Sequence, residues 1–295
     1  MKGSKKECAF IDVFADVRYS GNQLAVFPNA DQLSMGGMQK LANEINFSET
    51  TFINSSKDPS ADYEIRIFTP KTEMPFAGHP TIGAAYAIKD VFKLIPRNSE
   101  ALRLKTKVGV IPLYWNRDIT WMTQNPPRFF DQYTNKAEIA SLVNLSPKNL
   151  SEEFPIEEVS TGLRILIAPI NGLEAMQKAT AHIDNLGRFF KDKGISAPYL
   201  FTLETLSVDS KVHTRFFAPH LGIVEDAATG SAAGPLIAYL LKHEIFGKCF
   251  EIQNEQGVEM GRPSRIMMRG KMDDDRFLIQ VGGRCKYVGK GEYII

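Results

Sequence analysis

The stretch RIFTPKTEMPFAGHPT, residues 66–81, has a counterpart about half the chain further on. Its opening run Arg66-Ile67-Phe68-Thr69-Pro70 recurs as Arg215-Phe216-Phe217-Ala218-Pro219. In both places a glutamate follows and then a glycine, as Glu73 with Gly78 and as Glu225 with Gly230. Matches that keep the same order predict two homologous halves. Coincidental turn chemistry is the alternative interpretation.

Each repeated glycine opens a segment with almost no polar side chain. These segments are Pro80–Ile88 in the first half and Ser231–Leu241 in the second. A helix that is apolar on every face must be buried on every face, and small residues let the surrounding strands approach closely. We therefore predict that each half is a sheet curled around one central helix, and not a doubly wound parallel sheet.

Other runs in the sequence predict the remaining elements. The strand-like runs fall at 9–14, 24–27, 50–54, 64–68, 102–105, 119–123, 163–168, 199–206, 212–217, 249–253, 265–269 and 277–281. The predicted helices fall near 34–45, 81–92, 185–193 and 231–243. Asn125-Pro126-Pro127 can neither continue a strand nor enter a helix interior, so it predicts the linker between the halves.

The composition is that of an ordinary globular protein. Of 295 residues, 43% are hydrophobic and 23% are charged, which excludes disordered and low-complexity classes. The net charge of +1 gives no reason to expect nucleic acid or a membrane surface as a partner. There is no long apolar run and no signal-peptide core, and the three cysteines fit a reducing cytosol. We expect a cytoplasmic enzyme or small-molecule-binding protein.

Glu49 is a candidate general base. Asn46 precedes it by three residues, a spacing that can form a helix capping box. The β-branched and aromatic run Thr50-Thr51-Phe52-Ile53 instead favours a strand that begins at this point. Apolar Phe47 and Phe52 would partly bury the carboxylate and raise its pKa toward neutrality, where proton transfer is most effective. The residues alone leave a solvated surface glutamate as an equal alternative.

His79 lies in Gly78-His79-Pro80, at the predicted start of the first central helix. Proline suits a first helical turn, and Gly78 permits close approach of a ligand. The free N–H groups and the dipole at a helix start favour an anion and the neutral form of the imidazole. A structural cap is the alternative. The other histidines have no metal-ligand spacing, so we expect no metal site.

Asp226 precedes Thr229-Gly230-Ser231, which begin the second central helix. If the halves are homologous, the backbone N–H groups of Gly78, Gly230 and Ser231 converge on one small site. Two helix starts at one cavity suit a carboxylate substrate and an enolate-like transition state. Acidic residues are also common as helix caps. Asn22 and Ser48 are further candidates for substrate binding, and both are common turn residues as well.

Four motifs together resemble the PhzF phenazine-biosynthesis-like family, in the right order and over the whole chain. Phe14–Val26 resembles its opening motif, and Asn46–Phe52 looks like its acid/base motif. Arg66–Thr81 and Glu225–Ala232 are similar to the signatures of its two domains. The resemblance favours Glu49 as a general base over a surface role.

The resemblance implies a diaminopimelate-epimerase-like α+β fold. Such a fold has two pseudo-symmetric domains, each an antiparallel β-barrel-like sheet around a central buried helix, with the active site between them. We place the first domain at residues 1–127, completed by a C-terminal strand at 283–295, and the second domain at 128–282. The resemblance further implies a homodimer and no cofactor.

The functional hypothesis is a cofactor-independent isomerase of a small carboxylic acid. Glu49 would move the proton, while His79 and Asp226 would orient the substrate and adjust protonation. The resembling family's best-known activity is isomerisation of a dihydro-hydroxyanthranilate in phenazine synthesis. Racemases of the wider superfamily use two opposed thiols, but Ala77 and Thr229 stand about where those would lie. Two alternatives stay open: an epimerase or racemase of an amino-acid-like substrate, and a catalytically silent binding or adaptor protein.

Overall fold

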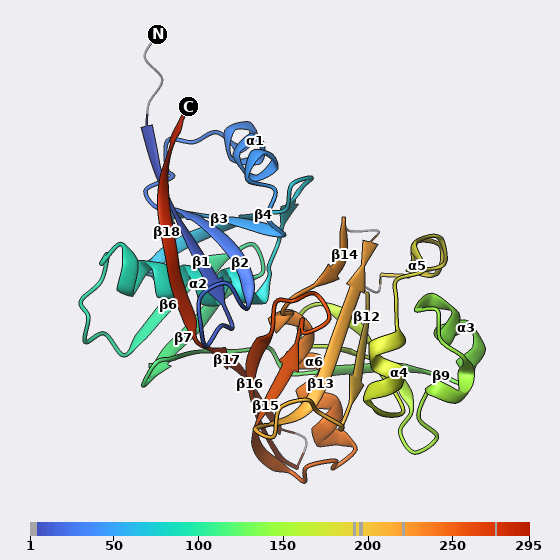
Figure 1. Cartoon of the computed structure of the whole chain (residues 1–295). Coiled ribbons are helices and arrows are strands. Elements are labelled where there is room, and N and C mark those ends of the chain that lie inside the picture. Colours follow the sequence, from blue (N-terminus) through green and yellow to red (C-terminus); the bar gives the residue numbers. More distant parts are fainter. Residues whose placement is uncertain (1–4, 191–192, 195–196, 220–221, 275) are drawn as a thin grey trace. The chain divides into compact units, whose positions relative to one another are not determined.

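A computed structural model describes residues 5–190, 193–194, 197–219, 222–274 and 276–295 of the chain. The chain forms two compact units (Figure 1). Unit 1 comprises Met1–Thr123 and Gly282–Ile295, and unit 2 comprises Gln124–Val281. The chain changes unit between Thr123 and Gln124, so the proline-rich segment that predicts a linker belongs to unit 2.

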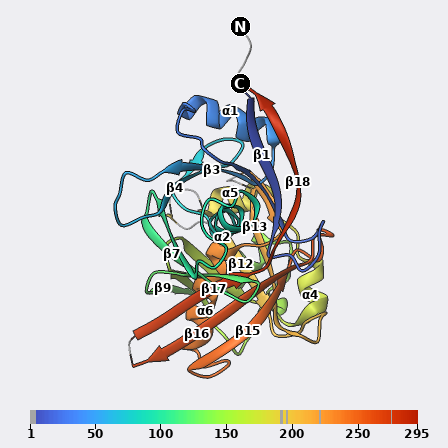
Figure 2. The same ribbon diagram turned by 90° about the vertical axis from the view of Figure 1, so that its left-hand side faces the viewer.

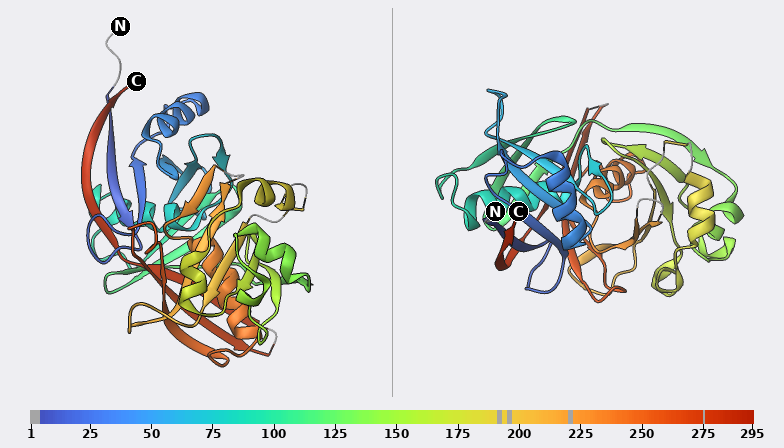
Figure 3. Two further views of the ribbon diagram at one scale, coloured as in Figure 1. Left: turned by 45° about the vertical axis from the view of Figure 1, so that its right-hand side comes forward. Right: turned by 90° about the horizontal axis from the view of Figure 1, so that it is seen from above.

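Unit 1 is mostly β-sheet. Its strands are β1 (Lys5–Val13), β2 (Asn22–Phe27), β3 (Glu49–Ser55), β4 (Tyr63–Phe68), β5 (Glu73–Met74), β6 (Ala101–Thr106), β7 (Gly109–Asn116), β8 (Ile119–Thr123) and β18 (Cys285–Ile294). Its helices are α1 (Met35–Ile45) and α2 (Gly78–Tyr86), and one π-helical turn, η1 (Ala87–Val91), extends α2. Strand β1 is antiparallel to both β2 and β18, so the C-terminal segment runs beside the first strand (Figures 1 and 3). The pairs β3–β4, β4–β5, β6–β7 and β7–β8 are also antiparallel.

Unit 2 contains a sheet with the same order of pairings. Its strands are β9 (Arg128–Tyr133), β10 (Ile156–Ser160), β11 (Arg164–Pro169), β12 (Ala197–Thr202), β13 (Ser210–Ala218), β14 (Ile223–Asp226), β15 (Cys249–Gln256), β16 (Ser264–Asp273) and β17 (Arg276–Gly283), and the chain passes from unit 2 into unit 1 within β17. Its helices are α3 (Lys136–Leu142), the 3₁₀ turn η2 (Pro147–Asn149), α4 (Gly172–Lys178), α5 (Ile183–Phe190) and α6 (Gly230–Lys242). The antiparallel pairs are β9–β10, β10–β11, β12–β13, β13–β14 and β15–β16.

The α+β class is confirmed, and the sheets, predicted as antiparallel, also contain parallel pairs. Strand β2 is parallel to β3 and β4 is parallel to β6, while in unit 2 β11 is parallel to β12 and β13 to β15. Parallel neighbours need a long crossover connection, usually a helix. Helix α1 connects β2 to β3, and α4 with α5 connects β11 to β12. The central helices α2 and α6 lie in the crossovers of the other two pairs, so every one of these parallel pairs is joined through a helix.

The central helices are buried along their length, as their apolar sequences predict. Gly78–Ala85 of α2 and Gly230–Leu241 of α6 are all buried. Helix α2 packs against β1, β2, β3, β4, β6 and β8, so the strands of unit 1 lie around it (Figure 2). At Gly83 a Cβ would overlap Leu24 Cδ2 and lie 2.7 Å from Val13 Cγ2. Within the described part of the chain, no helix is long and apolar enough to cross a membrane.

A second group of helices covers the other face of each sheet. Helix α1 begins at its cap Ser34, whose hydroxyl accepts a hydrogen bond of 3.1 Å from the Gly37 N–H. Its buried side chains pack on strand residues of β2, β3 and β4, among them Ala25, Phe27, Phe52 and Phe68. In unit 2, α3, α4 and α5 pack on Leu166, Ala168, Leu200 and Phe217. Each sheet therefore has an outer helical layer opposite its central helix.

Candidate active site

Glu49 is the first residue of β3 and is 7% exposed. Helix α1 ends shortly before it at Asn46, which adopts the left-handed conformation with φ of 57°. Asn46 therefore closes one helix and does not open another, so the capping-box interpretation is wrong. The alternative of a solvated surface glutamate is also wrong, because the side chain is buried.

Strand alternation decides which groups surround Glu49. Successive side chains of a strand point to opposite faces, so Phe52, three residues further on, points away from the face that carries Glu49. The Phe52 ring packs beneath α1, with its centroid 5.0 Å from that of Phe27 and 5.5 Å from that of Phe68. The expectation that Phe52 shields Glu49 is therefore wrong. The Glu49 carboxylate faces α2 instead.

His79, the second residue of α2, is 3% exposed and lies against Glu49. Its Nε2 is 3.5 Å from Oε2 of Glu49, which is longer than an ordinary hydrogen bond. Burial lowers the pKa of His79 to about 3, although a backbone contact with Gln23 acts in the opposite direction. The imidazole is therefore neutral at physiological pH and can donate one hydrogen bond.

Asn22 and Ser48 hold the other side of the imidazole. The side-chain nitrogen of Asn22, the first residue of β2, lies 3.3 Å from His79 Nδ1. The hydroxyl of Ser48 donates a hydrogen bond of 3.2 Å to Asn22 Oδ1. In the tautomer that accepts the Asn22 N–H at Nδ1, the ring proton lies on Nε2, on the side of Glu49. Because β2 and β3 are parallel, their starts bring Asn22, Ser48 and Glu49 to one edge of the sheet.

Gly78 places the start of α2 beside these side chains. It is the first helical residue and is buried, and the first N–H groups of a helix have no partner inside the helix. A buried carboxylate, a neutral imidazole and a helix N-terminus thus lie together in unit 1. This combination can accept a proton from carbon and stabilise the negative charge that develops.

In unit 2, Asp226 lies where β14 passes into α6. It is the last residue of β14 and is 7% exposed, and its Oδ2 accepts a hydrogen bond of 2.7 Å from Thr229 Oγ1. Thr229 is the N-cap of α6, and Gly230 and Ser231 are its first two residues. The carbonyl of Gly230 accepts a hydrogen bond of 2.8 Å from Gln124 Nε2. The structure therefore gathers the predicted unit 2 residues at one turn.

Gln256 holds this turn, although no sequence motif points to it. Its Nε2 donates to the Asp226 carbonyl at 2.8 Å and to Thr229 Oγ1 at 2.9 Å, and its Oε1 accepts from the Thr229 N–H at 3.2 Å. The Tyr199 hydroxyl also donates to Oε1, at 2.9 Å. Gln256 ends β15, and the parallel pairing of β15 with β13 places it there. A glutamine at a strand end carries no periodicity or spacing signal that would have revealed this role.

The repeated arginine and glutamate form the same ion pair in each unit. Arg66 donates from Nε and Nη2 to the two carboxylate oxygens of Glu73, at 2.8 Å each. Arg215 binds Glu225 in the same way, again at 2.8 Å twice. Each pair ties the short strand before a central helix to its neighbour, β5 to β4 and β14 to β13. The repeated residues thus position the turns from which α2 and α6 begin.

The three cysteine thiols lie away from the two helix starts. Among the described residues, no group of three or more His, Cys, Asp or Glu side chains could hold a metal ion. The cysteines lie in strands, Cys8 in β1, Cys249 in β15 and Cys285 in β18. The N-cap positions of α2 and α6 are occupied by Ala77 and Thr229, so neither helix start presents a thiol.

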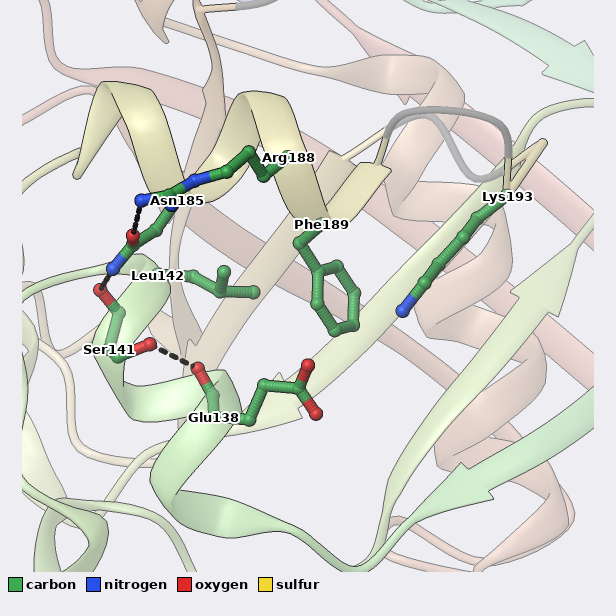
Figure 4. Close-up of a pocket in the computed structure, with 7 residues that line it drawn as sticks. All are labelled: Glu138, Ser141, Leu142, Asn185, Arg188, Phe189 and Lys193. Carbon is green, nitrogen blue, oxygen red and sulfur yellow. Dashed lines mark hydrogen bonds between the residues drawn. The ribbon is translucent and has the colours of Figure 1, made fainter.

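A hollow of about 350 Å³ in unit 2 contains none of the predicted site residues (Figure 4). Several of its polar groups bond one another. The Ser141 hydroxyl donates to the Glu138 carbonyl at 2.6 Å, and Arg188 donates to the Asn185 side chain at 3.0 Å. Lys193 lies over the Phe189 ring, 3.5 Å from its centroid. This hollow therefore offers no acid–base pair comparable to Glu49 and His79.

A family model described as phenazine biosynthesis-like protein matches residues 11–291. The chain belongs to this family. An uncharacterized isomerase of Clostridium acetobutylicum is 34% identical over 297 residues, with 97% of each protein covered. The trans-2,3-dihydro-3-hydroxyanthranilate isomerase of Pseudomonas aeruginosa is 34% identical over 288 residues, with 95% of this chain and 96% of that protein covered.

Solved structures of the phenazine biosynthesis-like family share the fold. The crystal structure of the Bacillus anthracis phenazine biosynthesis protein of the PhzF family matches with a TM-score of 0.91 at 28% identity. The match covers 99% of this chain and 100% of the Bacillus anthracis chain. The predicted family is therefore confirmed, and the named relatives support its predicted class, an isomerase.

Proposed function

We propose that the protein is a cofactor-independent isomerase that moves a proton within a small carboxylic acid, with Glu49 as the acid–base group. The observation that carries this proposal is the contact between Glu49 and His79. Both side chains are buried, and their polar atoms lie 3.5 Å apart at the start of α2. A general base in such a position is typically worth roughly 10²–10⁴ in rate.

In the proposed step, Glu49 removes a proton from a carbon atom of the substrate and becomes a neutral acid. The electron pair of the broken C–H bond moves into the adjacent unsaturated system, and Glu49 then returns the proton to another carbon of the same molecule. His79 donates a hydrogen bond from Nε2, and Asn22 and Ser48 keep its ring oriented. No electron is gained or lost overall, so the reaction needs no redox cofactor.

The helix starts supply the proposed contacts for the substrate carboxylate. Neither α2 nor α6 carries an acidic residue in its first turn, and the N–H groups and dipole of a helix start favour an anion. We assign Gly78 to carboxylate binding on this ground. On the family resemblance we assign Asp226, Gly230 and Ser231 to the same reaction, as groups that bind the substrate and adjust protonation.

We further propose that the two units arose by duplication of one ancestral unit, as two pseudo-symmetric domains. The support is the shared order of elements: an antiparallel pair, a parallel crossover, an arginine–glutamate pair and then a buried helix. On the family resemblance alone we propose a homodimer that works in the cytoplasm.

The first compound to test is trans-2,3-dihydro-3-hydroxyanthranilate, because the Pseudomonas aeruginosa relative is named for its isomerisation. The full chain is incubated in deuterated water with this compound, with other small unsaturated carboxylic acids and with amino acids, and each mixture is followed by NMR. An isomerase shifts a double bond and places deuterium on a new carbon. Deuterium on the original carbon with inverted configuration indicates an epimerase or racemase, and binding without exchange indicates a silent binding protein. Either result contradicts the proposal.

Cofactor independence has a separate test. The purified protein is dialysed against a chelator, and its metal content and absorption spectrum are recorded before the exchange assay. We expect the full exchange rate in the dialysed protein. A rate that collapses on dialysis and returns with a metal or a flavin would contradict the proposal.

A further inference from the structure

Unit 1 has a polar hollow of about 380 Å³ that the proposed reaction does not use. It lies beside η1, which extends α2 at the end opposite His79. Ten residues of helix separate His79 from Lys89, which is roughly 15 Å along the axis. None of the residues that we assign to the reaction lines this hollow. We call it the cationic hollow, after Lys89, Arg97, Arg117, Arg284 and Lys286, which line it.

The charges of the cationic hollow are unbalanced. Its acidic lining residues are Asp90 and Asp118. Asp118 is already paired, because Arg284 Nε lies 2.6 Å from its Oδ2, and Arg284 also binds Asp16 at 3.0 Å. When Arg284 and Asp118 are left out, the lining carries one acidic side chain, Asp90. It carries four basic ones: Lys89, Arg97, Arg117 and Lys286. The chain as a whole has a net charge of only +1, so the excess of positive charge is local to this hollow.

Two of these cations have unused binding capacity. Within the described part of the chain, the side chains of Arg97 and Arg117 have no ion-pair partner. Other arginines of unit 1 are engaged, as Arg66 is with Glu73 and Arg103 is with Asp62. A guanidinium group presents a planar fork of donors that fits the oxygens of a carboxylate or a phosphate.

The walls that carry Arg97 and Arg117 are held in place. The segment around Arg97 is fixed on both sides, because Tyr63 donates to the Leu94 carbonyl at 3.1 Å and Lys89 donates to the Ser99 carbonyl at 2.9 Å. Lys89 also lies over the Trp115 ring, 4.0 Å from its centroid. Arg117 lies in the tight turn between β7 and β8 with φ of 57°, a conformation that Asn or Gly adopts at less cost. These contacts hold the backbone on both sides of Arg97 before any ligand binds, while the side chains of Arg97 and Arg117 are exposed.

We propose that the cationic hollow binds a small polyanion, with Arg97, Arg117 and Lys286 contacting its phosphate or carboxylate groups. A volume of this size lies in the range of pockets that hold metabolites, roughly 300–1,000 Å³. A ligand with more than one anionic group matches the hollow better than a monoanion, since several cations lack a compensating acid.

The test is calorimetric titration of the full chain at constant ionic strength, with pyrophosphate as the phosphate probe and citrate as the carboxylate probe. We expect saturable binding of at least one of them, and the two arms show which oxyanion the site prefers. The double variant Arg97→Gln/Arg117→Gln should weaken that binding by about tenfold or more, because each charge-assisted hydrogen bond lost is among the strong ones. The thermal midpoint of this variant without ligand shows that it folds.

The matched control removes two charges elsewhere in unit 1. Lys40 and Lys57 are exposed and do not line the cationic hollow, so Lys40→Gln/Lys57→Gln should bind the probe as the wild type does. Binding that is absent at millimolar concentration, or equal in all variants, overturns the proposal. The deuterium exchange assay is run on the same proteins, so a failure of this proposal and a failure of the proposed reaction are seen separately.

Discussion

Two buried histidines of this chain titrate in opposite directions, and their partners explain why. His79 has Glu49 at 3.5 Å, beyond a hydrogen bond, and burial lowers its pKa to about 3. Burial alone would also lower the pKa of His213, but its ring nitrogens bond Glu255 at 2.9 Å and Glu259 at 3.0 Å. Those two carboxylates raise the pKa of His213 to about 9. His79 is therefore a neutral donor, and His213 is a buried cation.

The first prediction concerns the charge of His79. Its ring resonances in an NMR titration should stay those of neutral imidazole from pH 8 down to about pH 4, because its pKa in the folded state is about 3. The folded pKa lies below the unfolded value of about 6.5, so protonation favours the unfolded chain. The contribution of His79 therefore lowers the free energy of unfolding as the pH falls from about 6.5 toward 3. A His79 titration midpoint near 6.5 would contradict the assignment.

At the residue scale, the sequence predicts candidate residues more readily than it predicts which groups surround them. Glu49 and His79 stand out because a carboxylate opens a strand and a histidine follows a glycine at a helix start. The direction of Phe52 is wrong because the prediction overlooked strand alternation. Gln256 is missed altogether, since its role depends on a parallel pairing between distant segments.

Helix α2 fits its sheet through Gly83, and this fit gives the second prediction. A Cβ at Gly83 would overlap Leu24 Cδ2 and meet Val13 Cγ2, and both of those side chains are fully buried. Gly83→Ala should therefore lower the free energy of unfolding by about 1–3 kcal/mol, as overpacked cores do. Urea denaturation followed by circular dichroism measures this change.

Gly36 provides the matched control for Gly83. It also lies in a helix, α1, but a Cβ there would meet nothing within 4 Å. Gly36→Ala should raise the free energy of unfolding by up to about 1 kcal/mol, because alanine loses less backbone entropy on folding. Equal effects of the two substitutions would show that the close approach at Gly83 does not matter.

The third prediction concerns strand β13 and its neighbour β15. His213 of β13 contacts Glu255 and Glu259. Glu255 also lies 3.7 Å from Arg265, and Glu259 lies 3.9 Å from Arg215. The pKa of His213 is raised on folding, so its stabilising effect is complete below pH 6.5 and is lost as the pH rises through about 9. His213→Gln should therefore cost on the order of 1–3 kcal/mol near pH 6 and much less at pH 10. Thermal unfolding at both pH values measures the difference, and a cost that does not change with pH would contradict it.

At the element scale, local patterns predict α1, α2, α5, α6 and many strands, but they miss α3, α4 and the pairing of the strands. The apolar segments after Gly78 and Gly230 correctly predict two buried helices. The predicted strand 199–206 ends at Thr202 in the structure, because the following residues form a loop in which Glu255 binds the N–H groups of Leu206 and Ser207. The parallel pairs are missed because they join segments separated by a whole crossover helix.

For the whole molecule, the repeated motif is the strongest signal in the sequence. The Arg66–Glu73 and Arg215–Glu225 pairs are visible as a repeat, and the structure forms both with equal geometry. The chain passes from unit 1 to unit 2 between Thr123 and Gln124, immediately before the segment Asn125-Pro126-Pro127.

The fourth prediction concerns the assembly of the whole molecule. Light scattering at micromolar concentration should give a mass of about twice the 33.0 kDa chain, as the proposed homodimer requires. The basis is the family resemblance. A mass of one chain over the same concentration range would contradict the proposal.

The central claim is that Glu49 moves the proton, and the deuterium exchange rate of Glu49→Gln tests it most directly. The substitution keeps the size and hydrogen-bonding capacity of the side chain and removes only the base. The exposed Glu44→Gln in α1 is the matched control, and calorimetry with a non-reacting substrate analogue checks that both variants still bind. We expect exchange in Glu49→Gln to fall by roughly 10²–10⁴ while binding and the thermal midpoint stay near the wild-type values. Exchange at the wild-type rate in Glu49→Gln would contradict the account.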